Sequence, residues 1–306
     1  MQGNKKKSQR YVLRSPVIGR SFQQDLVDAE FRELDNARAF LLEYMDFEES
    51  VLQLIYAAEE FESFLLTTAL NQYLLPQYQY DAIQTNRLRA NLKMLGFLNS
   101  ITSLRDQFPK FRPLNPGFNM KQVFEKLWDD KKAASVAFRF SERLRNYAQH
   151  QTQPASSVSF GGGWDKNTGL MEDHMSVFVD VSNVCQNRNI GGSEKTLYEQ
   201  TFGKAADVAL VFRETMGTIG QIVLEIRGSL KPHLNLAVAN YERSADLVRK
   251  NDLPALEAAS LEGNKSQVLF SVFPQFTARA ISLSATHVMI NNQKHFISNR
   301  ARGHNN

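Results

Sequence analysis

Residues 139–150 hold the side chains of this sequence that are best suited to chemistry on a phosphodiester. On a helix of about 100° per residue, four of them form one polar stripe: Arg139, Arg143, Asn146 and His150. Arginine offers a permanent charge and a planar fork of donors that fits phosphate oxygens. A histidine exchanges protons near neutral pH, and an asparagine forms hydrogen bonds without titrating. With Arg145, the set suits cleavage of RNA by its own 2′-hydroxyl, which needs no metal ion.

Arg145 and His150 do not share a face of one straight helix, because they lie about 140° apart around its axis. A long arginine side chain, fraying of the helix before Pro154, or a second copy of the helix is needed to bring the two together. Each residue also has an ordinary structural role open to it. A histidine in the last turn can cap carbonyl groups, and an arginine on a helix side is usually solvated or paired with an acid such as Glu142.

Hydrophobic periodicity predicts that these residues belong to a mainly α-helical protein. Apolar residues recur at steps of three and four over five segments: 22–75, 80–107, about 121–151, 193–227 and about 232–250. The first segment is long enough for two helices, and a break is expected at Gly228. The third segment carries the polar stripe close to its end.

Two other segments show the alternation and the turn residues of β structure. Residues 155–190 predict a β-hairpin or ribbon, and residues 266–306 predict further β structure that includes a hairpin over 287–297. The predicted fold is therefore a helical bundle with a β-hairpin insertion and a small β-containing C-terminal tail. Three regions follow: a basic N-terminal tail over 1–20, a helical domain over 21–265 with the insertion at about 155–190, and the C-terminal tail over 266–306.

Composition limits the functional classes. Cys185 is the single cysteine among 306 residues, which excludes an intramolecular disulfide and a cysteine-rich metal site and suits a reducing cytosol. No apolar run approaches the roughly 20 residues needed to span a bilayer, and no apolar stretch follows the basic N-terminus as in a secretory signal. We therefore expect a cytoplasmic protein with no membrane association.

The net charge of +4 is unevenly distributed along the chain. Residues 1–20 hold six basic and no acidic residues, and the residues after Glu262 hold five basic and no acidic ones. The middle of the chain is therefore net acidic. Basic ends can bind phosphates, but they are as often solubilising tails, and both interpretations stay open.

No combination of residues predicts a metal or cofactor site. His174 follows Glu172 and Asp173, but no second histidine or cysteine stands at a ligand spacing from it. The glycines at 161–163 and 191–192 lack the Gly-Lys-Ser/Thr of a phosphate-binding loop and indicate turns instead. We therefore expect neither a metal ion nor a cofactor.

The end of the third predicted helix resembles the HEPN motif, in which a histidine follows an arginine by a few residues and a polar residue often directly follows the arginine. The matching residues are Arg145-Asn146-Tyr147-Ala148-Gln149-His150. The flanking residues are similar to the form found in a group of bacterial HEPN proteins: Phe138-Arg139-Phe140 before the motif and Pro154 after it. The preceding helix resembles its counterpart in the same group through Asn86-Arg87-Leu88, Asn91-Leu92, Phe97-Leu98, Ser100 and Asp106. The resemblance covers residues 45–155 well and the later helices loosely.

The resemblance implies an up-and-down helical bundle that commonly forms a homodimer, with the motifs of both subunits lining one cleft. It implies a metal-independent endoribonuclease that leaves a 2′,3′-cyclic phosphate, often a toxin or anti-phage defence effector restrained by an antitoxin or another regulatory protein. In that role Arg145 stabilises phosphate charge and positions His150, His150 acts as general base or acid, and Asn146 orients them. Thr152 stands where some relatives carry a tyrosine, so regulation through that tyrosine is not expected here.

Some HEPN proteins are non-catalytic binding modules, so two other functions stay open. One is a non-catalytic module that binds RNA or a partner protein through the same cleft. The other is a structural subunit whose bundle mediates oligomerisation. The intact motif favours the enzyme, with RNA as its substrate and a second copy of the chain as its partner.

Overall fold

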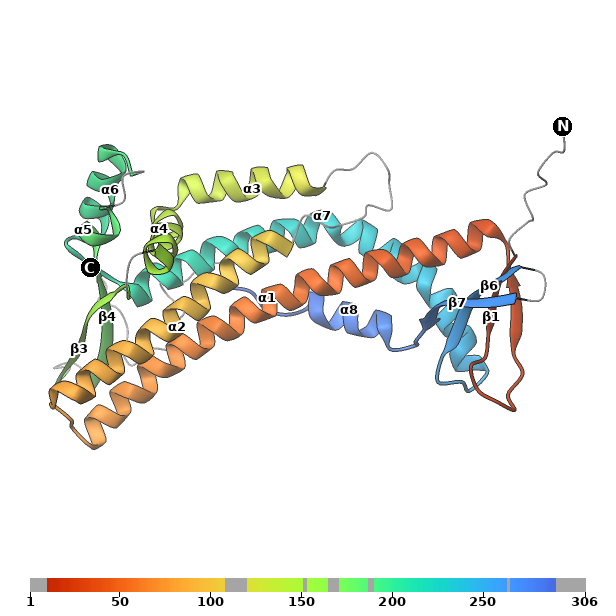
Figure 1. Cartoon of the computed structure of the whole chain (residues 1–306), viewed down its shortest axis with the longest axis horizontal. Helices are drawn as coiled ribbons and strands as arrows, with labels where there is room; N and C mark the ends of the chain where they lie inside the picture. The colour runs from red at the N-terminus through yellow and green to blue at the C-terminus, as the bar shows by residue number, and fades with distance from the viewer. Residues whose placement is uncertain are drawn as a thin grey trace. The chain divides into compact units, whose positions relative to one another are not determined.

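The computed structural model describes residues 10–107, 120–150, 153–164, 171–186, 190–262 and 265–289 (Figure 1). The protein is mainly α-helical, as the periodicity predicts, and carries two small antiparallel sheets. The chain divides into two compact units that alternate along the sequence. Unit 1 comprises 1–49, 109–121 and 227–286, and unit 2 comprises 50–108, 122–226 and 287–306.

Two long helices contribute residues to both units. Helix α1 (Asp28–Leu74) is one continuous helix of 47 residues, so the first periodic segment is not two helices. Helix α7 (Val208–Lys250) continues through Pro232, and the predicted break at Gly228 is wrong. Proline removes one helical hydrogen bond, but Leu230 and Leu234 around it are buried, and tertiary packing outweighs the local cost. None of the helices over the described residues combines the length and the apolar content that a bilayer crossing requires.

Helix α2 (Tyr80–Gln107) has the predicted bounds, but the next predicted helix is two helices. Helix α3 (Met120–Ala134) ends before Ser135, and helix α4 (Val136–His150) begins after it. Ser135 acts as the N-cap of α4, because its Oγ accepts a hydrogen bond from the backbone N–H of Phe138 at 3.1 Å. The polar stripe therefore sits on a short helix with its own start and its own direction.

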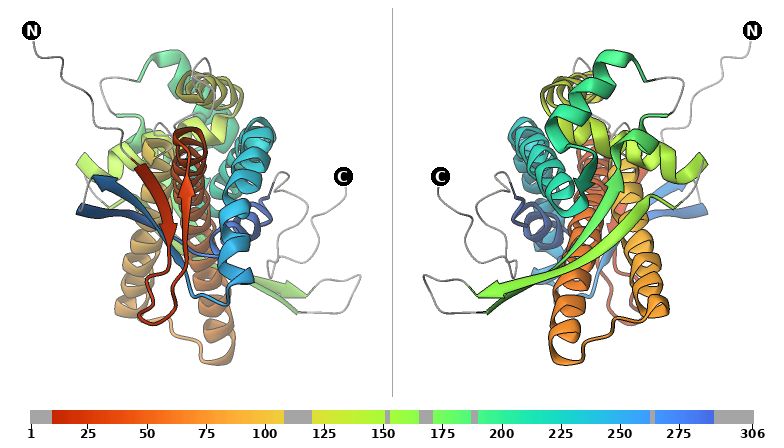
Figure 2. Two further views of the ribbon diagram at one scale, coloured as in Figure 1. Left: turned by 90° about the vertical axis from the view of Figure 1, so that its right-hand side faces the viewer. Right: turned by 90° about the vertical axis from the view of Figure 1, so that its left-hand side faces the viewer.

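The β-hairpin expected within 155–190 is present in unit 2. Strands β3 (Ala155–Trp164) and β4 (Met171–Asp180) pair antiparallel, and Figure 2 shows them as a twisted green ribbon. The sheet order is β3-β4-β5, with β5 at Ala205–Asp207. Helices α5 (Val181–Val184) and α6 (Gly192–Phe202) lie between β4 and β5 in the sequence.

The glycines at 161–163, predicted as turn residues, lie within strand β3. Gly161 pairs with His174 of β4, and a Cβ at Gly161 would lie 2.7 Å from Cε1 of the His174 ring. A side chain at this position would therefore collide with the imidazole. The glycine serves a close cross-strand approach and does not reverse the chain.

Unit 1 contains the second sheet, with strand order β2-β1-β6-β7. Its strands are β1 (Arg10–Arg14), β2 (Gln23–Leu26), β6 (Leu256–Glu262) and β7 (Lys265–Val272). Part of the predicted basic N-terminal tail is therefore a strand between β2 and β6, with Val12 and Leu13 fully buried. Strand β6 falls inside the region 21–265 that was assigned to the helical domain, beyond the last predicted helix.

The predicted C-terminal tail differs from the structure in one further element. Helix α8 (Phe276–Ser284) follows β7, where only β structure was expected. Of the hairpin predicted over 287–297, residues 287–289 are not in a strand, and the rest lies outside the described residues.

Candidate active site

Helix α4 is held in place by its apolar face. The buried residues of this face are Ala137, Phe138, Phe140, Ser141 and Leu144. Phe138 meets Trp128 of α3 edge-on at 5.0 Å between ring centroids, and Phe140 meets Tyr198 of α6 in the same way at 5.2 Å. Ser141 Oγ also forms a hydrogen bond with Thr215 Oγ1 of α7 at 2.9 Å. Contacts with three other helices, α3, α6 and α7, therefore fix the rotation of α4 about its axis and so decide where its polar residues point.

Arg145 and Asn146, two of the three predicted catalytic residues, line one small pocket of about 120 Å³. Its walls come from α2, α3 and α4, and they include Trp128. Arg145 Nε is buried and has no hydrogen-bond partner among the described residues. Trp128 is 1% exposed, and its Nε1 lacks a partner in the same way. Two N–H donors without acceptors therefore belong to residues that share this pocket.

A second pocket of about 190 Å³ lies beside the first along α4. It is lined by Lys132, Arg139, Glu142, Arg143, Asn146 and Glu194. Glu142 and Asn146 line both pockets, so these two residues form the ridge between them. Arg139 Nε is again buried and without a partner among the described residues. Three of the five such atoms in the described part of the chain thus belong to residues of this pair of pockets.

Positive charge predominates along the two pockets. They are lined by five cationic side chains: Arg105, Lys132, Arg139, Arg143 and Arg145. Glu142 is one of their two carboxylates, and it pairs with Lys132 at 2.6 Å and with Arg105 at 3.8 Å. The pairing of Glu142 with Arg145, considered from the sequence, is not what the structure shows. Arg145 therefore keeps its charge available for a ligand.

The other carboxylate, Glu194 of α6, is held by Arg143 and Tyr198. Arg143 Nη2 donates to it at 3.1 Å and the Tyr198 hydroxyl at 2.6 Å. Burial alone would raise the pKa of Glu194, but these two hydrogen bonds and the charge of Arg143 outweigh burial and lower it. Burial and the bond to Glu194 raise the pKa of Tyr198. Glu194 is therefore ionised at neutral pH and anchors Arg143 at the edge of the pocket.

His150, the third predicted catalytic residue, is the last residue of α4 and is exposed. It lines neither pocket. Five residues along a helix correspond to a rise of about 7.5 Å and a rotation of about 140°. The structure thus brings Arg145 and Asn146 together and leaves His150 apart from them within one chain.

Sequence reasoning missed the residues that other elements contribute to the site. Arg105 and Glu194 come from α2 and α6, and no spacing within α4 points to them. Trp128 of α3 was interpreted from the sequence as a core residue or a residue that stacks on bases, and it is 1% exposed. Among the additional pocket residues, only Arg139 and Arg143 were indicated by the sequence, because their helical spacing places them on the polar stripe. Among the described residues, no group of three or more His, Cys, Asp or Glu side chains is placed to hold a metal ion.

No protein-family model, curated protein or solved structure matches the chain.

Proposed function

We propose that the protein is a metal-independent endoribonuclease of the HEPN type. The observation that carries this proposal is the buried, unpartnered Nε of Arg145 in a pocket lined by an excess of cations. Buried N–H donors in folded proteins nearly always have an acceptor. A phosphate group of RNA supplies several acceptor oxygens together with the negative charge that the pockets favour. Trp128 Nε1 offers a second donor to the same group.

The chemistry assigned to these residues is attack of the RNA 2′-oxygen on the adjacent phosphorus. A bond forms between that oxygen and phosphorus while the bond to the 5′-oxygen breaks, which leaves a 2′,3′-cyclic phosphate and a 5′-hydroxyl. Negative charge builds on the phosphate oxygens during this step, and Arg145 stabilises it. His150 takes the proton of the 2′-hydroxyl or returns one to the 5′-oxygen. Asn146, which lines both pockets, orients the phosphate by hydrogen bonding.

The position of His150 argues for a homodimer. Because His150 lines neither pocket of its own chain, a second copy that brings its α4 alongside supplies the imidazole that Arg145 lacks. Two copies of His150 then serve one cleft, and one accepts a proton while the other donates one. This arrangement also removes the difficulty that Arg145 and His150 of one chain lie about 140° apart around the axis of α4, as five residues of a helix do.

The biological setting that we propose rests on the resemblance to HEPN proteins. It is a cytoplasmic toxin or anti-phage defence effector, restrained by an antitoxin or another regulatory protein until it is needed. The fold proposed with it is the up-and-down HEPN bundle, assigned to the helices of unit 2.

The test uses purified full-length protein and 5′-labelled RNA in EDTA. Arg145→Ala and His150→Ala are each expected to slow cleavage by about 100-fold or more, the usual range for loss of a charge-stabilising donor or of a general acid or base. Gln149→Ala is the matched control, since Gln149 is exposed at the same end of α4. Products should end in a 2′,3′-cyclic phosphate. If neither substitution changes the rate of cleavage, the assignment of Arg145 and His150 as catalytic residues is wrong.

The separation of His150 from the pockets favours one other function, a non-catalytic module that binds RNA. Such a module would retain RNA without cutting it, lose binding in Arg145→Ala and keep binding in His150→Ala. A gel-shift assay on the same variants separates the two functions.

A further inference from the structure

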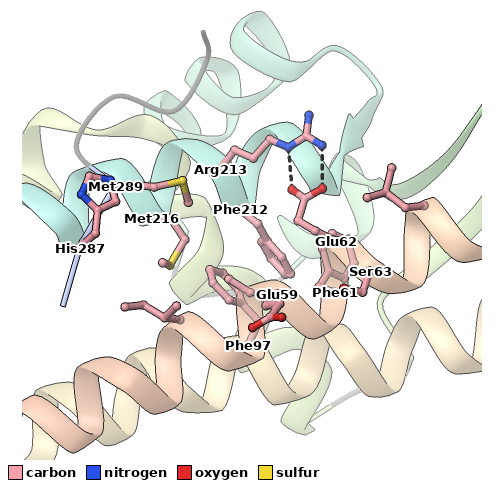
Figure 3. A pocket seen from close by; sticks show the side chains of 13 residues that line it. Glu59, Phe61, Glu62, Ser63, Phe97, Phe212, Arg213, Met216, His287 and Met289 are labelled. Atoms are coloured by element: carbon pink, nitrogen blue, oxygen red, sulfur yellow. Dashed lines mark hydrogen bonds and ion pairs between the residues drawn. The ribbon is translucent and has the colours of Figure 1, made fainter. Parts of the chain in front are cut away.

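A larger cavity of about 380 Å³ lies in unit 2, and none of its lining residues lines the α4 pockets. Its walls come from α1, α2, α7 and the segment 287–289 that follows α8 (Figure 3). The volume falls within the range of about 300–1,000 Å³ that small-molecule sites occupy.

The floor of this cavity is aromatic and apolar. Phe212 lies 4.2 Å from Phe97 and 5.0 Å from Phe61 between ring centroids, and all three side chains are buried. Met216 is also buried, and Met289 lies on the wall formed by the segment after α8. Water gains few hydrogen bonds against such a surface, so an apolar molecule is the favoured occupant.

Charged side chains lie at one side of the cavity, and their positive and negative charges do not sum to zero. Arg213 donates from Nε and Nη2 to the two carboxylate oxygens of Glu62, each at 2.7 Å, as the dashed lines in Figure 3 show. This bidentate pair is largely buried and carries no net charge. Glu59, one turn earlier on α1, has no hydrogen bond or ion pair among the described residues. Apart from His287, the charged side chains of the lining therefore leave one uncompensated negative charge, that of Glu59.

We propose that this cavity binds a small organic cation with an apolar body, independently of any action on RNA. The body packs against Phe61, Phe97 and Phe212, and the cationic group lies at Glu59. Aromatic rings also attract cations through their faces, so the floor and the carboxylate favour the same ligand charge. A ligand with a carboxylate head is disfavoured by Glu59, and a neutral one gains only the apolar contacts.

The test compares three probes that share one body: 4-phenylbutylamine, 4-phenylbutan-1-ol and 4-phenylbutanoate. Full-length protein labelled at its methionine methyl groups is titrated and followed by NMR, with Met216→Leu and Met289→Leu used for assignment. The amine is expected to shift the Met216 and Met289 signals and to bind most tightly. The alcohol should bind more weakly and the carboxylate most weakly.

Two variants decide where the charge and the body bind. Glu59→Gln should weaken the amine about threefold to tenfold and leave the alcohol unchanged, as expected for an exposed ion pair near 1 kcal/mol. Glu60→Gln is the matched control, because Glu60 pairs with Lys93 and does not line the cavity. Ala58→Met fills the cavity and should abolish binding of all three probes while thermal unfolding shows a folded protein.

Three results would overturn the proposal. The first is that the amine leaves the Met216 and Met289 signals unmoved, as would happen if another part of the chain filled the cavity. The second is that the carboxylate binds as tightly as the amine. The third is that Glu59→Gln and Glu60→Gln weaken binding of the amine equally. Each result is independent of RNA cleavage, so the ribonuclease proposal stands or falls separately.

Discussion

At the scale of single residues, the site is defined by donors that lack acceptors. Arg145, Arg139 and Trp128 each hold a buried N–H with no partner among the described residues, and all three line the pockets beside α4. Leaving a buried donor unsatisfied costs about 1–3 kcal/mol. Such a cost is tolerated where a ligand supplies the missing acceptor, and the surplus of cations around these donors is our reason for proposing an anion in that role.

Trp128→Phe tests this reasoning, because it removes the indole N–H and keeps an aromatic ring against Phe138. We expect affinity for a non-cleavable 2′-O-methyl RNA to fall about threefold to tenfold, the effect of one hydrogen bond. Trp164→Phe is the control, since Trp164 is exposed at the end of β3. Fluorescence anisotropy in EDTA measures both. Equal losses in the two variants would show that Trp128 donates nothing to the ligand.

At the scale of elements, the interruption at Ser135 decides what α4 presents. A single helix across residues 120–150 would place the polar stripe in continuity with α3, but Ser135 ends that continuity and caps a new helix. The aromatic contacts of Phe138 and Phe140 then set the face that α4 buries. Because α4 is a separate helix and not a continuation of α3, its polar residues line pockets together with residues of α2, α3 and α6.

Ser135→Ala removes the cap and is expected to lower the free energy of unfolding by about 1 kcal/mol. Ser135→Thr keeps a hydroxyl that can accept the same N–H of Phe138 and should cost less. Chemical denaturation monitored by circular dichroism gives both values. An alanine variant as stable as the threonine variant would show that the hydroxyl does not cap α4.

At the scale of the whole molecule, unit 1 gathers segments that are distant in the sequence. Arg227 of α7 donates from Nε and Nη2 to Glu48 of α1 at 2.9 and 2.6 Å, and from Nη1 to the carbonyl oxygen of Thr286 at 2.7 Å. Glu48 is 1% exposed. This buried pair links α1, α7 and Thr286, two residues after the end of α8, within unit 1.

Glu48→Leu should therefore destabilise the protein by about 3–5 kcal/mol, because it leaves the Arg227 charge buried without its partner. The double variant Glu48→Leu with Arg227→Met removes both charges and should recover a large part of that loss. Thermal or urea unfolding of the two variants measures the difference. A double variant less stable than Glu48→Leu alone would contradict the assignment of the cost to the unpaired arginine.

Local pattern predicted the parts of the fold that depend on local interactions. The bounds of α2, the mainly helical class and the presence of the β3–β4 hairpin follow from the periodicity of apolar residues, because this signal acts over a few residues. The position of the hairpin turn did not follow, since the glycines at 161–163 lie within β3. The polar stripe with Arg139, Arg143 and Asn146 was likewise evident from spacing on one helix. The sequence alone therefore indicated the candidate residues of α4 but not those that other elements contribute to the pockets.

Tertiary structure decided which of those residues meet. Strand β1 lies beside β6, nearly the whole chain away, and no local signal identifies such a pairing. Helix α7 passes Pro232 because buried neighbours stabilise it, and Arg145 enters a pocket because α2 and α3 supply the walls. His150, the last residue of α4, is exposed and lines neither pocket. Burial depends on partners brought from a distance, and a periodic pattern carries no information about which partners those are.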